Sequence, residues 1–289
     1  MQGLGSAPGE VCGARRSEVS PRGNLASENS HSEPAAAVAV EGVSFGYGKE
    51  RLVLDDLSVR FPAGKLTCIV GPNGCGKSTL LKLADGLLKP SAGRILMDGR
   101  DTAALGHKDR ARLVAFMVQE MPAPHMSVVD LVACGRFSYG ASKLSADDRA
   151  VVDRCLALAD LDHLRAKSCR EVSGGERRRA QLAMCLAQQA PILLLDEPTS
   201  YLDIAAAHRM MDLVSGLCHQ QGTTALMVVH DIDLALRYSD HLVVMSAGSV
   251  LGEGCVDDVL ASGAIQRAFS IAIHPTALGE GTGYVIFPQ

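Results

Sequence analysis

The stretch Gly71-Pro72-Asn73-Gly74-Cys75-Gly76-Lys77-Ser78-Thr79 restricts the possible folds of this chain more than any other part of the sequence. It matches the phosphate-loop pattern G-x-x-x-x-G-K-[ST] at every fixed position. The apolar run Leu66–Val70 predicts a strand before the loop, and the leucine spacing from Ser78 to Leu88 predicts a helix after it. Because a phosphate loop needs a strand before it and a helix after it, the sequence predicts an α/β nucleotide-binding core.

The chemistry of this loop predicts that the chain binds a nucleoside triphosphate. Glycines let successive backbone N–H groups turn toward phosphate oxygens, and the following helix adds the positive end of its dipole. Lys77 would reach the β- and γ-phosphates, and the Ser78 hydroxyl would hold Mg²⁺. The thiol of Cys75 lies beside Lys77 and a helix N-terminus, so we expect a lowered pKa there. The candidate phosphate ligands are Gly71, Asn73, Gly74, Cys75, Gly76, Lys77, Ser78 and Thr79.

Two further apolar runs end in polar residues. Asp196 and Glu197 follow the run Ile192–Leu195, and His230 follows Ala225–Val229. In open α/β sheets the carboxyl ends of the strands face the ligand crevice. We therefore expect Asp196 to hold Mg²⁺ through its water shell, Glu197 to orient or deprotonate the attacking water, and His230 to bind the γ-phosphate. The alternatives are a solvated acidic turn and a histidine next to a helix cap.

A Ser-Gly-Gly-Glu segment, Ser173 to Glu176, stands directly before a helical pattern. Unpaired N–H groups at a helix start predict a second anion site, and an ordinary N-cap is the alternative. The three arginines that follow, Arg177 to Arg179, are predicted to form a solvated helix face. Tyr47 lies where its ring could stack on an adenine, although strand tyrosines are common.

Composition excludes some classes of protein. The net charge is −4, which gives no sign of a nucleic-acid-binding surface. The nine cysteines have no C-x-x-C spacing, which favours free thiols in a reducing cytosol. No apolar run approaches the roughly 20 residues that a membrane-spanning helix needs. If the protein works at a membrane, another chain has to span it.

The pattern divides the chain into parts. Residues 1–36 are rich in Gly, Ser, Pro, Glu and Arg, which predicts a disordered extension. A single domain is expected over 37–270, with a β-rich opening and a helical insert at about 120–172. Ser145 is the predicted cap of the longest helix in that insert. A mixed C-terminal tail, 271–289, completes the chain.

Taken in order, the motifs resemble those of the ATP-binding subunit of ATP-binding-cassette (ABC) transporters, over about residues 38–260. The resemblance implies an α/β fold: a P-loop NTPase core with an N-terminal antiparallel β subdomain and an inserted helical subdomain. It also implies that the chain is an ATPase that uses ATP and Mg²⁺. The matching positions are Tyr47, the loop from Gly71 to Thr79, Gln119, Ser173 to Glu176, Ile192 to Glu197, Ser200 to Asp203, and His230.

The same resemblance implies roles for individual residues. Tyr47 would stack on adenine, Gln119 would sense Mg²⁺ and the attacking water at a hinge, and His230 would be a switch histidine. The signature Ser173, Gly174, Gly175 and Glu176 would close over the ATP of a partner subunit, and the turn that ends at Asp203 would cross to that partner. The sequence departs from the commonest family pattern in two places. Val172 and Glu176 flank the signature glycines where Leu and Gln are commonest, and Tyr201 stands where Ala is common. Neither departure removes a phosphate-binding group.

Partners are also implied by the resemblance. The chain would pair head to tail with a second copy of itself. Two separate membrane-spanning permease subunits would contact it near Gln119 and the helical insert, and a substrate-binding protein would act indirectly. It would then be a peripheral protein on the cytoplasmic face of the cell membrane, with no nucleic acid as partner.

Three strings indicate the cargo. The segments Pro124–Arg136, Thr199–Ile204 and Phe269–Ile271 are similar to those of importers of ferric siderophores, haem and cobalamin. The preferred cargo is an iron(III)-siderophore complex, and haem or cobalamin is the alternative. A soluble, non-transport ABC ATPase is a second alternative, but such proteins carry two cassettes or a long coiled coil. A small-molecule kinase would leave the signature and Gln119 unexplained.

Overall fold

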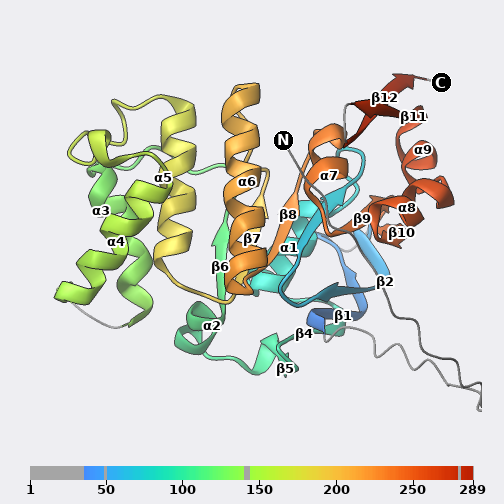
Figure 1. Ribbon diagram of the computed structural model, residues 1–289. Helices are drawn as coiled ribbons and strands as arrows, with labels where there is room; N and C mark the ends of the chain where they lie inside the picture. Colours follow the sequence, from blue (N-terminus) through green and yellow to red (C-terminus); the bar gives the residue numbers. More distant parts are fainter. Residues whose placement is uncertain (1–35, 49–50, 140–143, 279–280, 289) are drawn as a thin grey trace, which may run out of the picture. The chain divides into compact units, whose positions relative to one another are not determined.

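The computed structural model describes residues 36–48, 51–139, 144–278 and 281–288 (Figure 1). The extension predicted for residues 1–36 therefore lies outside the described residues, apart from Ala36. The predicted α/β class is confirmed, with two main sheets and a group of helices.

The larger sheet has the strand order β10-β9-β3-β8-β7-β6. The strands from β9 to β6 are parallel to their neighbours, and β10 is antiparallel to β9. The predicted strands of the core are all present in it. Its strands are β3 (Leu66–Val70), β6 (Val114–Met117), β7 (Ile192–Asp196), β8 (Thr224–Val228), β9 (His241–Ser246) and β10 (Ser249–Gly254).

Both faces of this sheet are buried, which explains why its central strands are continuously apolar. Leu193 and Leu195 point into a core shared with α5 and α6. Ile192 and Leu194 point to the opposite face and pack in a core shared with α1 and the smaller sheet. The helices beside the sheet are α1 (Lys77–Asp85), α2 (His107–Leu113), α6 (Ile204–Gln221), α7 (Ile232–Tyr238), α8 (Val256–Ser262) and α9 (Ala264–Phe269).

The smaller sheet is antiparallel, in the order β2-β1-β4-β5, and confirms the predicted β subdomain. Its alternating pattern buries Val38 and Val40 from β1 and Leu57 and Val59 from β2 in the core that α1 shares. Its strands are β1 (Ala36–Phe45), β2 (Leu54–Pro62), β4 (Ala92–Met97) and β5 (Arg100–Asp101), followed by the 3₁₀ turn η1 (Thr102–Ala104).

The predicted helical insert contains α3 (Val128–Ala133), α4 (Ala146–Leu158) and the 3₁₀ turns η2 (Cys134–Tyr139) and η3 (Asp162–Leu164). They lie together with α5 (Gly174–Ala187) (Figure 1). Ser145 is the N-cap of α4, and its hydroxyl accepts a hydrogen bond from the Asp148 N–H, which confirms the predicted cap. The hydrophobic core of the insert also includes Ala180, Ala183 and Ala187 of α5.

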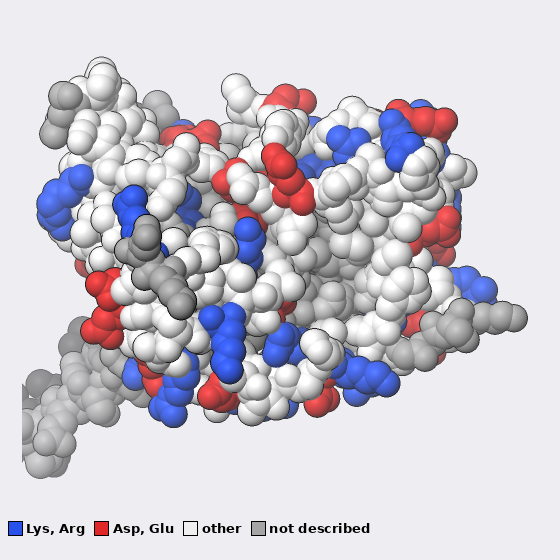
Figure 2. All heavy atoms as spheres, turned by 180° about the vertical axis from the view of Figure 1, so that it is seen from behind, with Lys and Arg blue, Asp and Glu red and all other residues white. Residues whose placement is uncertain are grey.

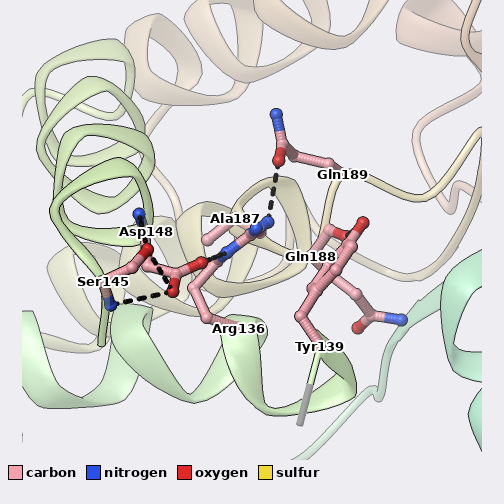
Figure 3. Close-up of polar contacts among 7 residues, drawn as sticks. All are labelled: Arg136, Tyr139, Ser145, Asp148, Ala187, Gln188 and Gln189. Carbon is pink, nitrogen blue, oxygen red and sulfur yellow. Dashed lines mark hydrogen bonds and ion pairs between the residues drawn. The ribbon is translucent and has the colours of Figure 1, made fainter. Parts of the chain in front are cut away.

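A buried arginine ties the insert to the C-terminal end of α5 (Figure 3). Arg136 Nε donates to Asp148 Oδ1 at 2.9 Å, and both side chains are about nine-tenths buried. Arg136 Nη1 donates to the Ala187 carbonyl and to Gln189 Oε1, each at 2.8 Å. The guanidinium also lies 4.0 Å from the centre of the Tyr139 ring, a cation–π contact. Three segments are therefore held by one side chain.

The C-terminal tail is more regular than the mixed stretch that we predicted. Strands β11 (Ile271–Leu278) and β12 (Gly281–Pro288) form an antiparallel pair with continuous register. Ile271 and Ile273 from one strand and Tyr284 and Ile286 from the other pack against the main core. The two-residue period of these apolar positions is the sequence signal for this pair of strands.

Charges of both signs alternate over the face shown in Figure 2, and neither forms a broad patch there. Among the described residues, none of the helices has the length and hydropathy needed to cross a bilayer.

Candidate nucleotide-binding site

Four neighbouring strands bring the predicted chemistry to one edge of the larger sheet. Gly71 follows β3, His230 lies two residues after β8, Glu197 follows β7, and Gln119 lies two residues after β6. These strands are consecutive in the order β3-β8-β7-β6 and are parallel. Because their carboxyl ends meet at one edge, residues far apart in the sequence lie close together there.

The phosphate loop is packed on both sides. Gly76 is the N-cap of α1 with φ of 106°, a conformation that favours glycine, and a Cβ there would meet Leu54 Cδ2 at 2.5 Å. A Cβ at Gly71 would collide with the Met245 carbonyl at the end of β9. The Gly248 N–H donates to the Cys75 carbonyl at 3.2 Å. The glycines therefore allow a close approach as well as a turn.

Lys77 is buried and folds back over its own loop. Its ammonium donates to the Gly71 carbonyl at 2.7 Å and to the Pro72 carbonyl at 3.0 Å. These contacts satisfy a buried charge and hold the ammonium over the loop, where a phosphate would lie.

The expectation of a lowered thiol pKa at Cys75 is wrong. The side chain is only 5 % exposed, and burial raises the pKa of the thiol. The charge of Lys77 and backbone N–H groups act in the opposite direction but do not outweigh burial. The sequence showed the nearby positive charge and did not show the packing against Gly71.

We therefore expect Cys75 to react slowly with thiol-alkylating reagents, because it is buried and its reactive thiolate form is disfavoured. Among the cysteines that the structure describes, Cys255 is exposed and should be modified first. After brief treatment with N-ethylmaleimide at neutral pH, peptide mass spectrometry should find the adduct at Cys255, with ATP turnover retained. Rapid inactivation that Cys75→Ser abolishes would contradict this expectation.

Ser78 and Asp196 meet at the base of the site. The Ser78 hydroxyl donates to Asp196 Oδ1 at 2.9 Å. Asp196 Oδ2 is buried and has no hydrogen-bond partner among the described residues. Burial raises the pKa of Asp196, and the Ser78 hydrogen bond opposes this shift. An unpartnered carboxylate oxygen beside a hydroxyl fits a hard divalent cation such as Mg²⁺, which prefers oxygen ligands.

Glu197 is held by two polar side chains. His230 Nε2 lies 2.6 Å from Glu197 Oε1, and the Ser200 hydroxyl donates to Oε2 at 3.2 Å. The backbone of Glu197 has φ of 51°, the left-handed region that non-glycine residues rarely adopt. Such strain is typical of functional positions, where the surroundings enforce it.

A cavity of about 420 Å³ opens at this edge, within the ~300–1,000 Å³ typical of small-molecule sites. Tyr47 lies at its rim, 64 % exposed, with its hydroxyl 3.2 Å from Thr79 Oγ1. Most of the predicted residues therefore share one space. The lining residues are Tyr47, Val53, Asn73, Gly74, Gly76, Lys77, Ser78, Thr79, Gln119, Glu197 and His230.

The signature residues do not line this cavity. Ser173 is the N-cap of α5, with Glu176 completing a capping box. Asp203 is the N-cap of α6 and accepts from the Ala206 N–H at 2.7 Å. Gly174 and Gln119 line a second cavity, of about 330 Å³. The structure thus separates two groups of predicted site residues.

One buried position beside the site escaped the sequence analysis. Arg178 was predicted to lie on a solvated helix face, and this is wrong, because its side chain is 4 % exposed. It donates to the carbonyls of Val118, Asp196 and Glu197 and to Gln181 Oε1. Burial lowers the pKa of the guanidinium, and the charges of Asp196 and Glu197 oppose this shift. An arginine within a polar run gives no sign of such contacts.

Comparison with known proteins identifies relatives. The ABC transporter family model matches residues 54–200. The chain is 38 % identical to YusV of Bacillus subtilis, designated a siderophore transport system ATP-binding protein, over 83 % of this chain and 88 % of that one. It is 35 % identical to the ferric enterobactin transport ATP-binding protein FepC of Escherichia coli, over 83 % and 89 %. The cobalamin import ATP-binding protein BtuD of Halobacterium salinarum is 38 % identical, over 76 % and 56 %.

A solved structure shares the fold. It is a dimeric ATP-binding cassette in a post-hydrolysis state bound to ADP and phosphate, with a TM-score of 0.70 and 27 % identity. The similarity covers 76 % of this chain and 98 % of that one.

Proposed function

This chain belongs to the ABC transporter family of ATP-hydrolysing subunits, and from that membership we propose that it drives uptake of an iron(III)-siderophore complex. The observation that supports this choice of cargo is the similarity, over about four-fifths of the chain, to ATP-binding subunits whose names specify siderophore and enterobactin transport. Because a cobalamin import protein is also among the relatives, cobalamin is the alternative cargo.

The site geometry supports a role for each residue in hydrolysis. Lys77 and the loop amides would bind the β- and γ-phosphates in place of the carbonyls that Lys77 now contacts. Glu197 would orient the attacking water, and Ser200 and His230 hold its carboxylate in position. Tyr47 lies at the rim, where its exposed ring can stack on the adenine.

Mg²⁺ is the cofactor that the donor set fits. Ser78 and Asp196 would hold it, with Gln119 reaching it from the end of β6. When bound, it would neutralise charge that develops on the transferred phosphate. The remaining ligands would be water and phosphate oxygens, since a group of three or more His, Cys, Asp or Glu side chains suited to a metal is absent from the described residues.

A second copy of the chain would complete the site. Ser173, Gly174, Gly175, Glu176 and Asp203 lie outside the cavity that contains the phosphate loop. In a head-to-tail pair these residues would contact the ATP of the partner subunit. The dimeric form of the similar cassette supports this arrangement.

Two permease subunits would transmit the closure of this pair to the cargo. We place the chain at the cytoplasmic face of the membrane as a peripheral subunit, with a substrate-binding protein acting indirectly. The contact surface would include the helical insert and the segment after Gln119.

Lys77→Ala should abolish uptake of radiolabelled iron supplied as a siderophore complex, because it removes the ammonium that would bind the phosphates. Among the described residues, Lys77 is the only buried lysine. The measurement is uptake by cells whose own copy of the gene has been replaced by the variant. Lys89→Ala, which removes an exposed lysine just beyond α1, is the matched control and should retain uptake.

Cobalamin and haem uptake should be unaffected by Lys77→Ala. If the variant takes up siderophore normally but loses cobalamin or haem uptake, the cargo is cobalamin or haem instead. The proposed ATPase mechanism would not be affected by that result. Normal uptake of all three would contradict the importer function.

A further inference from the structure

Arg178 makes the most concentrated set of buried contacts near the site. Its Nη2 donates to the Asp196 carbonyl at 2.6 Å and to the Glu197 carbonyl at 2.7 Å. Its Nη1 donates to the Val118 carbonyl and to Gln181 Oε1, both at 2.9 Å. A planar guanidinium can reach several acceptors at once, which an ammonium on a flexible stem does less well.

The backbone carbonyls that accept these hydrogen bonds belong to the two segments that contain Glu197 and Gln119. The Asp196 and Glu197 carbonyls lie on the two sides of the Glu197 Cα, whose left-handed conformation persists only where its surroundings enforce it. The Val118 carbonyl belongs to the peptide that leads into Gln119. One side chain therefore holds the backbone on which Glu197 and Gln119 are mounted.

Arg178 itself is mounted on the helix that starts with the signature. It lies in the second turn of α5, and Ser173 to Glu176 form the cap and first turn of the same helix. A displacement of that first turn would move the guanidinium with it, because a helix moves as a rigid element over so short a distance.

We propose that Arg178 is a positioning residue that couples the signature segment of a subunit to ATP hydrolysis in the same subunit. The inference rests on the proposed function, since it requires the signature to contact the ATP of a partner. Contact of that ATP with Ser173 and Gly174 then adjusts Glu197 and Gln119 through Arg178. Each of the two sites thereby responds to occupancy of the other.

The neighbouring arginines do not make such contacts. Arg179 Nε donates to the Ala159 carbonyl at 3.1 Å, within the helical insert, and Arg177 Nη1 reaches the Cys169 carbonyl at 3.5 Å. Both side chains are partly exposed. Arg179→Lys is therefore a matched control on the same helix.

The test compares steady-state ATP hydrolysis by Arg178→Lys, Arg178→Gln and Arg179→Lys with that of the unmodified protein. Misplacement of a catalytic group by about 1 Å can cost about 100-fold in rate. We expect Arg178→Lys to lower kcat about 10- to 100-fold with KM for ATP within about threefold. The Hill coefficient should fall from above 1 to about 1. Arg178→Gln should show the same split with a larger loss, and Arg179→Lys should match the unmodified protein.

A merely structural role predicts a different pattern. If Arg178→Lys and Arg178→Gln raise KM in parallel with a loss of kcat, or leave the Hill coefficient unchanged, the proposal is wrong. It is equally wrong if the unmodified protein has a Hill coefficient of 1. If Arg178→Gln unfolds, as thermal denaturation would show, Arg178→Lys alone decides, because it keeps the charge and most of the length of the side chain.

Failure of the proposed function is recognised separately. In a Glu197→Gln background, size-exclusion chromatography should detect a dimer in the presence of ATP, with Arg178 intact. If no dimer forms, the head-to-tail pair fails, and the inference fails with it. If the dimer forms but Arg178→Lys hydrolyses ATP like the unmodified protein, only the role of Arg178 is refuted.

Discussion

Glu197→Gln should leave ATP binding intact and lower ATP turnover by about two orders of magnitude or more. The amide keeps the size of the side chain and can keep its contacts with Ser200 and His230, but it loses the charge that would polarise the attacking water. Because hydrolysis no longer removes the γ-phosphate, ATP should hold the protein as a dimer. Equilibrium binding of ATP, phosphate release and size-exclusion chromatography measure these three effects.

The matched control for this variant is Glu171→Gln, which makes the same chemical change at an exposed position in the helical insert. It should hydrolyse ATP at the normal rate and stay monomeric after turnover. Near-normal hydrolysis by Glu197→Gln would remove Glu197 from the catalytic role, and weak ATP binding would show that the substitution damages the phosphate site as well.

Arg136→Ala should lower Tm by on the order of 10 °C, because it leaves Asp148 and the Ala187 carbonyl buried without their partner. Hydrogen bonds from Ser145, and then from Arg136, lower the pKa of Asp148 to about 2, so this carboxylate is charged at neutral pH. The loss should be concentrated in α3, α4 and α5, whose amide hydrogens should exchange faster. Thermal denaturation and hydrogen exchange measure the two effects.

Arg165→Ala is the control for exposure. It removes an ion pair with Asp153 in the same helical region, but both side chains are about half exposed, and such pairs contribute about 0–1 kcal/mol. We expect a change in Tm of no more than a few degrees. If the two variants were equally stable, the buried network around Arg136 would have no special importance for the insert.

Sequence reasoning predicted the parts of the fold that obey a local rule. Ile192 to Leu195 is apolar throughout because both faces of the strand are buried, so its neighbours at the sheet edge, Asp196 and Glu197, stand out. The phosphate loop is recognisable because its glycines, lysine and hydroxyl residues stand at fixed spacing between Gly71 and Thr79. In both cases a short stretch of consecutive residues is enough to recognise the feature.

The remaining features depend on contacts between distant segments. The burial of Cys75 arises from packing within the loop and against the β9–β10 turn, and its effect on the pKa exceeds that of the nearby charge. The role of Arg178 depends on carbonyls contributed by β7 and by the end of β6. The strands β11 and β12 were missed although their apolar residues alternate, because the Pro and Gly residues at 275, 281 and 283 obscure the period.

Helix α5 has a mechanical consequence that follows from where it is attached. Near its first turns Arg178 fixes it to the nucleotide edge of the sheet, and at its last residue Arg136 fixes it to the helical insert. Fourteen residues make a rod about 21 Å long. Pivoting by about 10° at Arg178 would move Ala187, at the far end of the helix, by about 2 Å, by the helix rise. A displacement at the start of the helix is thereby roughly doubled at the end that contacts the helical insert, by the ratio of the two arm lengths.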